Sequence, residues 1–161
     1  MLRARDHELP GEAHDTSAPR RRGAGPPGPS RPALEAAVCE AVFRYQLQQP
    51  PADPPQPPRY YLALRGRDPD AALLRRLGAV TPGVQPFSHC RVTAREGVVD
   101  RATGARGVIV QVARLAWVHA AAVDVVGGYY LTHRQAASFR YQVEPDGPRW
   151  VVTAAHLLWR V

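Results

Sequence analysis

The stretch GVIVQVARLAWVHA, residues 107–120, constrains the fold of this chain more than any other segment. Successive side chains of a β-strand point to opposite faces. Here both alternating sets are apolar: Val108, Val110, Val112, Ala116 and Val118 on one side, and Ile109, Ala113, Leu115 and Trp117 on the other. A strand of this kind buries both of its faces. We therefore predict that residues 107–120 form a central strand of a sheet, with other elements packed on each side.

The segments around this strand predict an antiparallel meander. Residues 136–144, AASFRYQVE, alternate between apolar and polar side chains, which places Ala137, Phe139, Tyr141 and Val143 toward the core and Ser138, Arg140, Gln142 and Glu144 toward water. The tripeptide PDG at 145–147 predicts a turn, and residues 149–161 are expected to return as the last strand. Together with residues 87–94 and 121–131, the prediction is about five consecutive strands.

Two adjacent glycines, Gly127 and Gly128, interrupt the segment 121–131. Glycine inside a strand often marks a bulge or a sharp bend, and a curved sheet needs bends. Tyr129 and Tyr130 follow directly, so we expect their rings to point to opposite faces. We therefore interpret this stretch first as a bend of the sheet and second as the rim of a pocket.

Two helices are predicted ahead of the meander. Residues 32–49 carry an apolar stripe at helical spacing, formed by Leu34, Val38, Val42 and Tyr45. Residues 68–78 carry Asp68 as a helix cap, Pro69 at the first helical position and Gly78 as a left-handed stop. Helices followed by antiparallel strands predict an α+β fold. We expect N-terminal helices packed on a curved antiparallel sheet of about five strands.

The chain divides by composition into a tail and one domain. Residues 1–31 contain SAPRRRGAGPPGPSRP and have no hydrophobic periodicity, which predicts a disordered tail. An upstream extension that is not part of the expressed protein is a second explanation for these residues. Residues 32–161 are predicted to form a single α+β domain, with a proline-rich connector at 50–58.

The net charge and the first residues of the chain bear on its binding partners and on its cellular compartment. The formal net charge is +7, but all 21 basic residues are arginine, and the tight cluster Arg20–Arg22 lies in the predicted tail. Dense basic patches with aromatic partners are typical of nucleic-acid binding, so this composition disfavours that function. No apolar leader stands at the start, and no run approaches the roughly 18 apolar residues of a membrane helix. We expect a cytoplasmic protein whose Cys39 and Cys90 are free thiols.

In this order of elements the chain resembles a group of small bacterial proteins with an NTF2-like (cystatin-like) α+β cone. The resemblance covers roughly residues 33–155 and rests on AVCEAVFRYQL, DPDAALLRRL, FSHCRV, VVDRATGARGVIVQVARLAWV, VVGGYYLTHRQAASFRYQV and RWVV. It implies a bent sheet wrapped on a helix, often in a homodimer. It contains no catalytic signature and lends no established activity to the chain.

The candidate pocket residues are Tyr45, His119, Tyr129 and Tyr141. NTF2-like cones can host ketosteroid-isomerase or dehydratase chemistry, in which an acid or histidine pair works with a tyrosine donor in an apolar pocket. Asp124 is also available, but it alternates with Val123 and Val125, which favours a position facing solvent. We therefore expect non-catalytic binding of a partner chain or a small apolar ligand, in a homodimer formed through the sheet. A small pocket enzyme of the isomerase or dehydratase type is the alternative.

Metal and cofactor sites are not predicted. His89 and Cys90 are adjacent, so in a strand they would point to opposite faces. His119, His133 and His156 lie on separate predicted elements, and the sequence contains no HxH, HxxxH or CxxC motif. No phosphate-binding loop or GxSxG nucleophile motif is present either.

Overall fold

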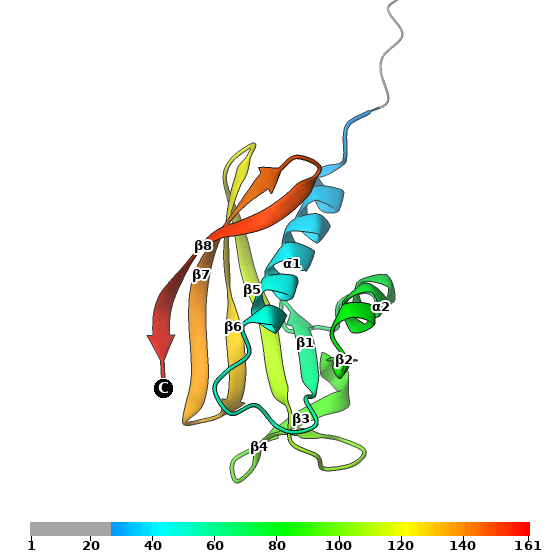
Figure 1. Cartoon of the computed structure of the whole chain (residues 1–161), viewed down its shortest axis with the longest axis vertical. Helices are drawn as coiled ribbons and strands as arrows, with labels where there is room; N and C mark the ends of the chain where they lie inside the picture. The colour runs from blue at the N-terminus through cyan, green and yellow to red at the C-terminus, as the bar shows by residue number, and fades with distance from the viewer. Residues whose placement is uncertain (1–26) are drawn as a thin grey trace, which may run out of the picture.

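A six-stranded sheet with two helices on one face forms the fold of this chain (Figure 1). The structure is a computed structural model and describes residues 27–161; the predicted tail lies mostly outside this range. The helices are α1 (Arg31–Gln48) and α2 (Ala71–Val80), with a short 3₁₀ turn, η1 (Phe87–His89). The strands are β1 (Tyr60–Leu64), β2 (Val84–Pro86), β3 (Cys90–Thr93), β4 (Gly97–Asp100), β5 (Val108–His119), β6 (Ala122–Thr132), β7 (Gln135–Asp146) and β8 (Arg149–Arg160).

The predicted α+β class is confirmed, and the sheet is larger than expected. Its strand order is β2-β1-β5-β6-β7-β8, and the last four strands form an antiparallel meander. The prediction of about five antiparallel strands was wrong in one respect, because β1 joins the sheet parallel to both β2 and β5. The strand β1 was missed because its apolar pentapeptide, YYLAL, is compatible with either a short strand or a helical turn. Helix α2 provides the crossover that parallel pairing of β1 and β2 requires.

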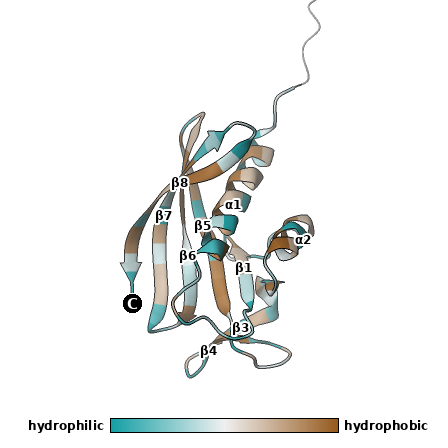
Figure 2. Ribbon diagram, viewed as in Figure 1, coloured by the Kyte–Doolittle hydropathy of each residue, from teal (hydrophilic) through white to brown (hydrophobic). Residues whose placement is uncertain are grey.

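The strands β3 and β4 form a separate hairpin instead of extending the main sheet. They cover the outer face of β1 and β5, where Tyr61, Ala63, Cys90, Val98 and Ile109 form a second small core. The first half of β5, which Figure 2 colours as apolar, is therefore buried on both faces, as its sequence predicted. Beyond Val112 the prediction was wrong, because the hairpin no longer covers the strand and Arg114, Ala116 and Val118 are exposed. The register shift between Val112 and Arg114 also places Ala116 on the face opposite to Val112.

The main core lies between α1, α2 and the inner face of the sheet. Buried side chains from both helices and from β1, β5, β6 and β7 form one cluster, which includes Val38, Val42, Phe43, Leu73, Leu77, Val112, Val125 and Val143. At the N-terminal end of α1, the sheet curls over the helix (Figure 1). There Trp150 of β8 packs edge-on against Trp117 of β5, with ring centroids 5.6 Å apart, and the Arg31 guanidinium lies 4.1 Å from the Trp117 ring centroid.

Both helices begin at side-chain caps, but α2 does not begin or end where the sequence suggested. Asp70 caps α2 by accepting a 2.8 Å hydrogen bond from the Leu73 N–H. Asp68, the predicted cap, instead accepts hydrogen bonds from the Ser88 N–H and hydroxyl, at 2.7 and 2.6 Å. Gly78 was predicted to stop the helix and lies inside it, and Thr81 is the C-terminal cap. Helix α1 begins at Arg31, with Ser30 as its cap.

A buried tyrosine–carboxylate pair fastens the β3–β4 hairpin to the sheet. The Tyr61 phenol donates a 2.8 Å hydrogen bond to Asp100, whose other carboxylate oxygen accepts from the N–H groups of Ala102 and Thr103. These donors, with Tyr61 first, lower the pKa of Asp100 to about 2. Burial, reinforced by the carboxylate, raises the pKa of Tyr61 above its usual value. Asp100 thus both makes the turn after β4 and anchors it to the sheet.

The register predicted for β7 is confirmed for most of its side chains. Tyr141 and Val143 are buried, whereas Arg140, Gln142 and Glu144 are exposed. Phe139 packs against the main core and is only half-buried. Ser138 was expected to face water and is buried, because it lies in register between Gly128 and Trp159 of the neighbouring strands.

This register predicts unequal costs for two neighbouring substitutions. Replacing Phe139 with alanine should lower the free energy of unfolding by about 2 kcal/mol, roughly half the cost of removing a fully buried phenylalanine. Replacing the exposed Arg140 with alanine should change it by no more than about 0.5 kcal/mol. Urea denaturation of the two variants measures both values. A larger loss for Arg140→Ala than for Phe139→Ala would contradict the register.

Candidate ligand-binding cleft

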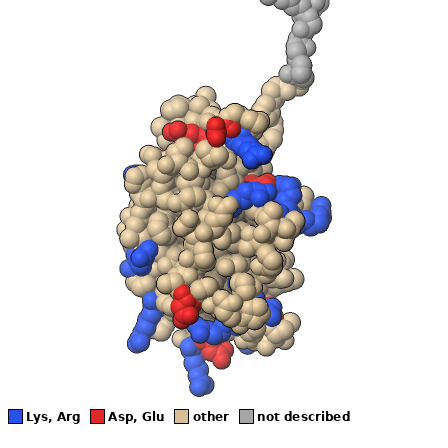
Figure 3. Space-filling model, viewed as in Figure 1, with Lys and Arg blue, Asp and Glu red and all other residues tan. Residues whose placement is uncertain are grey.

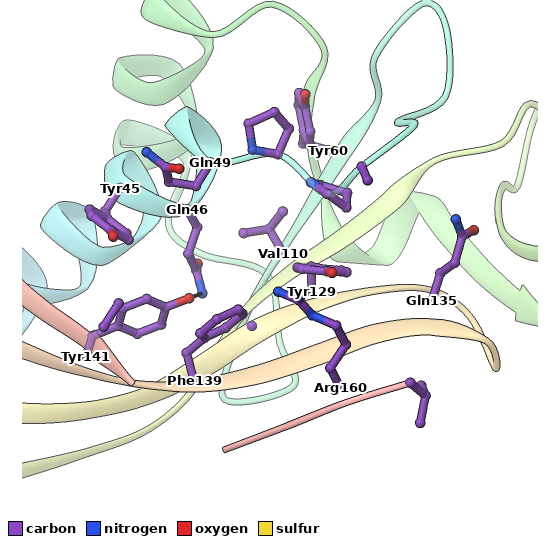
Figure 4. A pocket seen from close by; sticks show the side chains of 16 residues that line it. Tyr45, Gln46, Gln49, Tyr60, Val110, Tyr129, Gln135, Phe139, Tyr141 and Arg160 are labelled. Atoms are coloured by element: carbon purple, nitrogen blue, oxygen red, sulfur yellow. Dashed lines mark hydrogen bonds between the residues drawn. The ribbon is translucent and has the colours of Figure 1, made fainter. Parts of the chain in front are cut away.

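An open cavity of about 570 Å³ lies between the C-terminal half of α1, the connector that follows it and the inner face of the sheet (Figure 4). We call it the α1–sheet cleft. Its lining is formed by Tyr45, Gln46, Gln49, Pro50, Pro51, Ala52, Tyr60, Val110, Gly128, Tyr129, Gln135, Phe139, Tyr141, Ala155, Arg160 and Val161. Gln46, Val110 and Tyr141 are buried, whereas Gln49, Ala155, Arg160 and Val161 are exposed. The cleft therefore opens along the edge formed by β8.

The proline-rich connector forms one wall of the cleft. Helix α1 ends at Gln48, and the chain then continues without regular structure to β1. Proline cannot extend a helix into this segment, because it lacks the backbone N–H and its ring clashes with the preceding turn. Pro51 is buried, and Pro50, Pro51 and Ala52 all line the cleft. This part of the connector is packed against the domain.

Five aromatic side chains are among the remaining residues that line the cleft. Tyr45 of α1 meets Tyr141 of β7 edge-on with ring centroids 5.7 Å apart, and Phe139 lies 5.8 Å from Tyr141 at an interplanar angle of 30°. Tyr129 faces them from β6 (Figure 4). Burial raises the pKa of Tyr141 to about 12. The phenol is therefore neutral at physiological pH and acts as a hydrogen-bonding group.

Gln46 is the buried polar group of the cleft. Its Nε2 donates to the backbone carbonyl of Gln111 at 3.0 Å and to the Tyr141 hydroxyl at 3.3 Å. Its Oε1 is buried and has no hydrogen-bond partner among the described residues. The side chain is only 7% exposed, so water does not reach it freely. A buried acceptor without a donor costs about 1–3 kcal/mol, and a ligand that carries a donor would recover this energy.

Gly127 makes room for the Gln46 amide. A Cβ at this position would meet the Gln111 carbonyl oxygen and would lie 2.9 Å from Gln46 Nε2. On β5 the register shifts between Val112 and Arg114, directly beside the Val112–Gly127 pair. The bulge that the two glycines predicted is therefore on the neighbouring strand. Gly128 is equally constrained, because a Cβ there would meet the Ala137 carbonyl oxygen.

Three of the four candidate residues from the sequence lie together in this cleft. Tyr45, Tyr129 and Tyr141 all line it. His119 lies elsewhere, exposed at the end of β5, where its Nδ1 accepts a 3.2 Å hydrogen bond from the Ala121 N–H. Asp124 pairs in register with Ala116 and Gln142 on the outer face. The structure thus brings the tyrosines together and leaves the histidine and the carboxylate outside.

Sequence reasoning missed Gln46 and Arg160. Gln46 stands four residues after Val42 and eight after Val38, so it is a polar side chain on the buried face of α1. That position was the signal for a functional or hydrogen-bonded group. Arg160 faces the cleft because it pairs with the inward-facing Ala137 of β7. Two register shifts along β8 precede that pair, and the alternation of the sequence does not reveal them.

Other kinds of site find little support within residues 27–161. No cluster of three or more histidine, cysteine, aspartate or glutamate side chains is placed to hold a metal ion in this range. None of the described helices is long and apolar enough to cross a membrane. Cys39 and Cys90 are buried free thiols, and burial raises the pKa of each to about 11. A thiol with this pKa is a poor nucleophile at neutral pH.

Comparisons of the chain with models of protein families, with curated proteins and with solved structures found no match.

The steric role of Gly127 predicts a costly substitution. Gly127→Ala should lower the free energy of unfolding by about 1–3 kcal/mol, as overpacking of a tight interior typically does. Gly78→Ala is the matched control, because Gly78 lies inside α2 with open space around its Cβ position. That change should raise stability by about 0.5–1 kcal/mol. Thermal unfolding of both variants tests the pair, and equal stabilities would contradict the packing described for Gln46.

Proposed function

We propose that this chain is an NTF2-like domain that binds a small, mostly apolar ligand in the α1–sheet cleft and does not catalyse a reaction. A ligand site is typically a concave, largely apolar cavity of about 300–1,000 Å³ with a few placed polar groups. The cleft has a volume of about 570 Å³, aromatic walls and the amide of Gln46. The observation that carries the proposal is the buried, unpartnered Oε1 of Gln46 at this cleft. The helix followed by a four-stranded meander supports the NTF2-like assignment.

The isomerase or dehydratase alternative has less support. That chemistry needs a carboxylate or an imidazole close to a tyrosine donor. The described residues that line the cleft include four tyrosines and no histidine, aspartate or glutamate. The side chains that the sequence offered for this role, His119 and Asp124, are directed away from the cleft. Binding without proton transfer is therefore the function that these groups favour.

Ligand binding can be tested with a neutral apolar dye, N-phenyl-1-naphthylamine. Titration should give a saturable rise in its fluorescence. Ala155→Trp should weaken dye binding at least tenfold, because Ala155 is an exposed cleft residue and a bulky ring there would enter the cavity. Ala154→Trp is the matched control, because the adjacent side chain points to the outer face, in register with Gln142. Equal dye affinity in the two variants would argue against the cleft as the binding site.

We further propose that two copies of the chain associate through the β8 edges of their sheets. Strand β8 is 12 residues long and pairs only with β7 among the described strands. It contains no proline or acidic residue, and Leu157, Leu158 and Trp159 are about half exposed. Natural edge strands are usually short or carry charges and prolines that block pairing. The other edge, β2, fits that rule, with three residues that end at Pro86.

The edge of β8, rather than a face of the sheet, is the surface that supports dimerisation. From the sequence we expect a homodimer formed through the sheet, with no edge specified. In the structure the β3–β4 hairpin covers the apolar side chains of β1 and of the first half of β5 on the outer face of the sheet. The remainder of this face mixes polar side chains with the exposed Ala116 and Val118; the polar ones include Arg114, Asp124, Arg140 and Gln142. Charged side chains are also dispersed over the face seen in Figure 3 instead of forming one patch.

Light scattering after size exclusion tests the proposed dimer. The full chain should elute as a dimer at tens of micromolar, and Leu158→Lys should make it monomeric by placing a charge on the edge strand. Val92→Lys is the control, because Val92 is equally exposed (52%) but lies on the β3–β4 hairpin. A monomeric wild-type chain at this concentration would exclude the dimer.

A further inference from the structure

The α1–sheet cleft carries an arginine that makes no ion pair within the described chain. Arg160 is the only charged side chain among the residues that line it. Over residues 27–161, the ion pairs join Glu35 and Glu40 to other arginines and do not involve Arg160. Its side chain extends from β8 toward Tyr129 at the mouth of the cleft (Figure 4). A ligand in the cleft therefore meets a guanidinium group that is not held in an ion pair by a described carboxylate.

An unpaired arginine favours an anionic ligand of a particular kind. The guanidinium group presents parallel N–H donors that match the two oxygens of a carboxylate. A single arginine balances the one negative charge of a carboxylate, whereas a phosphomonoester carries between about 1.5 and 2 negative charges at neutral pH. No other cation lines the described cleft. The charge therefore favours a monocarboxylate.

The second polar group of the cleft selects for a hydrogen-bond donor. Gln46 Nε2 donates to the Gln111 carbonyl, and this bond fixes the orientation of the amide. The opposite orientation would place two acceptors, Oε1 and the carbonyl, against each other. Because Oε1 accepts no hydrogen bond from the described residues, a hydroxyl or N–H group on the ligand would satisfy it.

The walls between these two groups fit a flat apolar body. Gln46 reaches the cleft from α1 and Arg160 from β8, with the rings of Tyr129, Phe139 and Tyr141 beside them (Figure 4). Aromatic side chains favour stacked or edge-on contacts with planar rings. We infer that the ligand is a cyclic, preferably aromatic, monocarboxylic acid that carries a hydroxyl or N–H group. Its carboxylate binds Arg160, and its donor binds Gln46.

This inference rests on the proposed function. Three probes distinguish a failure of the inferred ligand class from a failure of the proposed function. The probes are 6-hydroxy-2-naphthoic acid, 2-naphthoic acid and 6-hydroxy-2-naphthamide, each measured by displacement of the neutral dye from the full chain. The hydroxy acid should bind most tightly. Loss of the charge, in the amide, should weaken binding at least tenfold. Loss of the hydroxyl group, in 2-naphthoic acid, should weaken it at least threefold.

Two charge variants on β8 test whether Arg160 is responsible for the preference for a carboxylate. Arg160→Gln should weaken binding of the hydroxy acid at least tenfold and leave that of the amide unchanged. Arg149→Gln is the matched control, because Arg149 is an exposed arginine at the other end of β8 and does not line the cleft. That variant should bind all three probes as the wild type does. Higher salt should weaken binding of the acids more than that of the amide.

Each outcome has a distinct meaning. If the amide binds as tightly as the hydroxy acid, or if Arg160→Gln leaves acid binding unchanged, the carboxylate assignment is wrong and ligand binding by the cleft stands. Equal affinity for the two acids would refute the role given to Gln46. If none of the three probes displaces a bound dye, the ligand class is wrong. Failure of the dye itself to bind would overturn the proposed function and this inference with it.

Discussion

The close approach of α1 to the sheet at Gly127 sets the geometry of the rest of the domain. A side chain at this position would collide with the backbone of β5 and press against the amide of Gln46. Its absence allows Gln46 to bridge α1, the Gln111 carbonyl of β5 and the Tyr141 hydroxyl of β7. Those contacts fix the C-terminal half of the helix over the meander. The cleft is the space that remains beyond this contact, between the helix end, the connector and β8.

Much of the fold follows from local sequence patterns, and each departure from the prediction has an identifiable physical cause. The two apolar faces of β5 and the alternation of β7 were sufficient to predict the centre of the sheet. Gly78 was misread because glycine is common just after a helix, yet continued hydrogen bonding to Thr81 carries α2 past it. Asp68 and Asp70 are both suitable caps, and the difference between them is a tertiary contact: Ser88 engages Asp68 from 20 residues away.

The site was predictable only in part. The tyrosines were candidates because they occupy inward positions on α1, β6 and β7. Ala155 could not be assigned to the cleft, because β8 shifts register at two points and the alternation between them is inverted. Strict alternation from Val152 would place Ala154 inward, but the structure pairs Ala155 with the inward-facing Tyr141. Bulges of this kind depend on the fit between neighbouring strands, and no single strand encodes them.

The way in which the cleft is assembled bears on the order of folding. The hairpins from β5 to β8 join residues that are close in the chain, so their formation costs little loop entropy. By contrast, the cleft brings Tyr45 of the first described helix and Arg160 of the last strand into one cavity. Its walls meet only when α1 packs on the meander. The cleft is therefore complete only once the two ends of the domain have come together, and a bound molecule would link them.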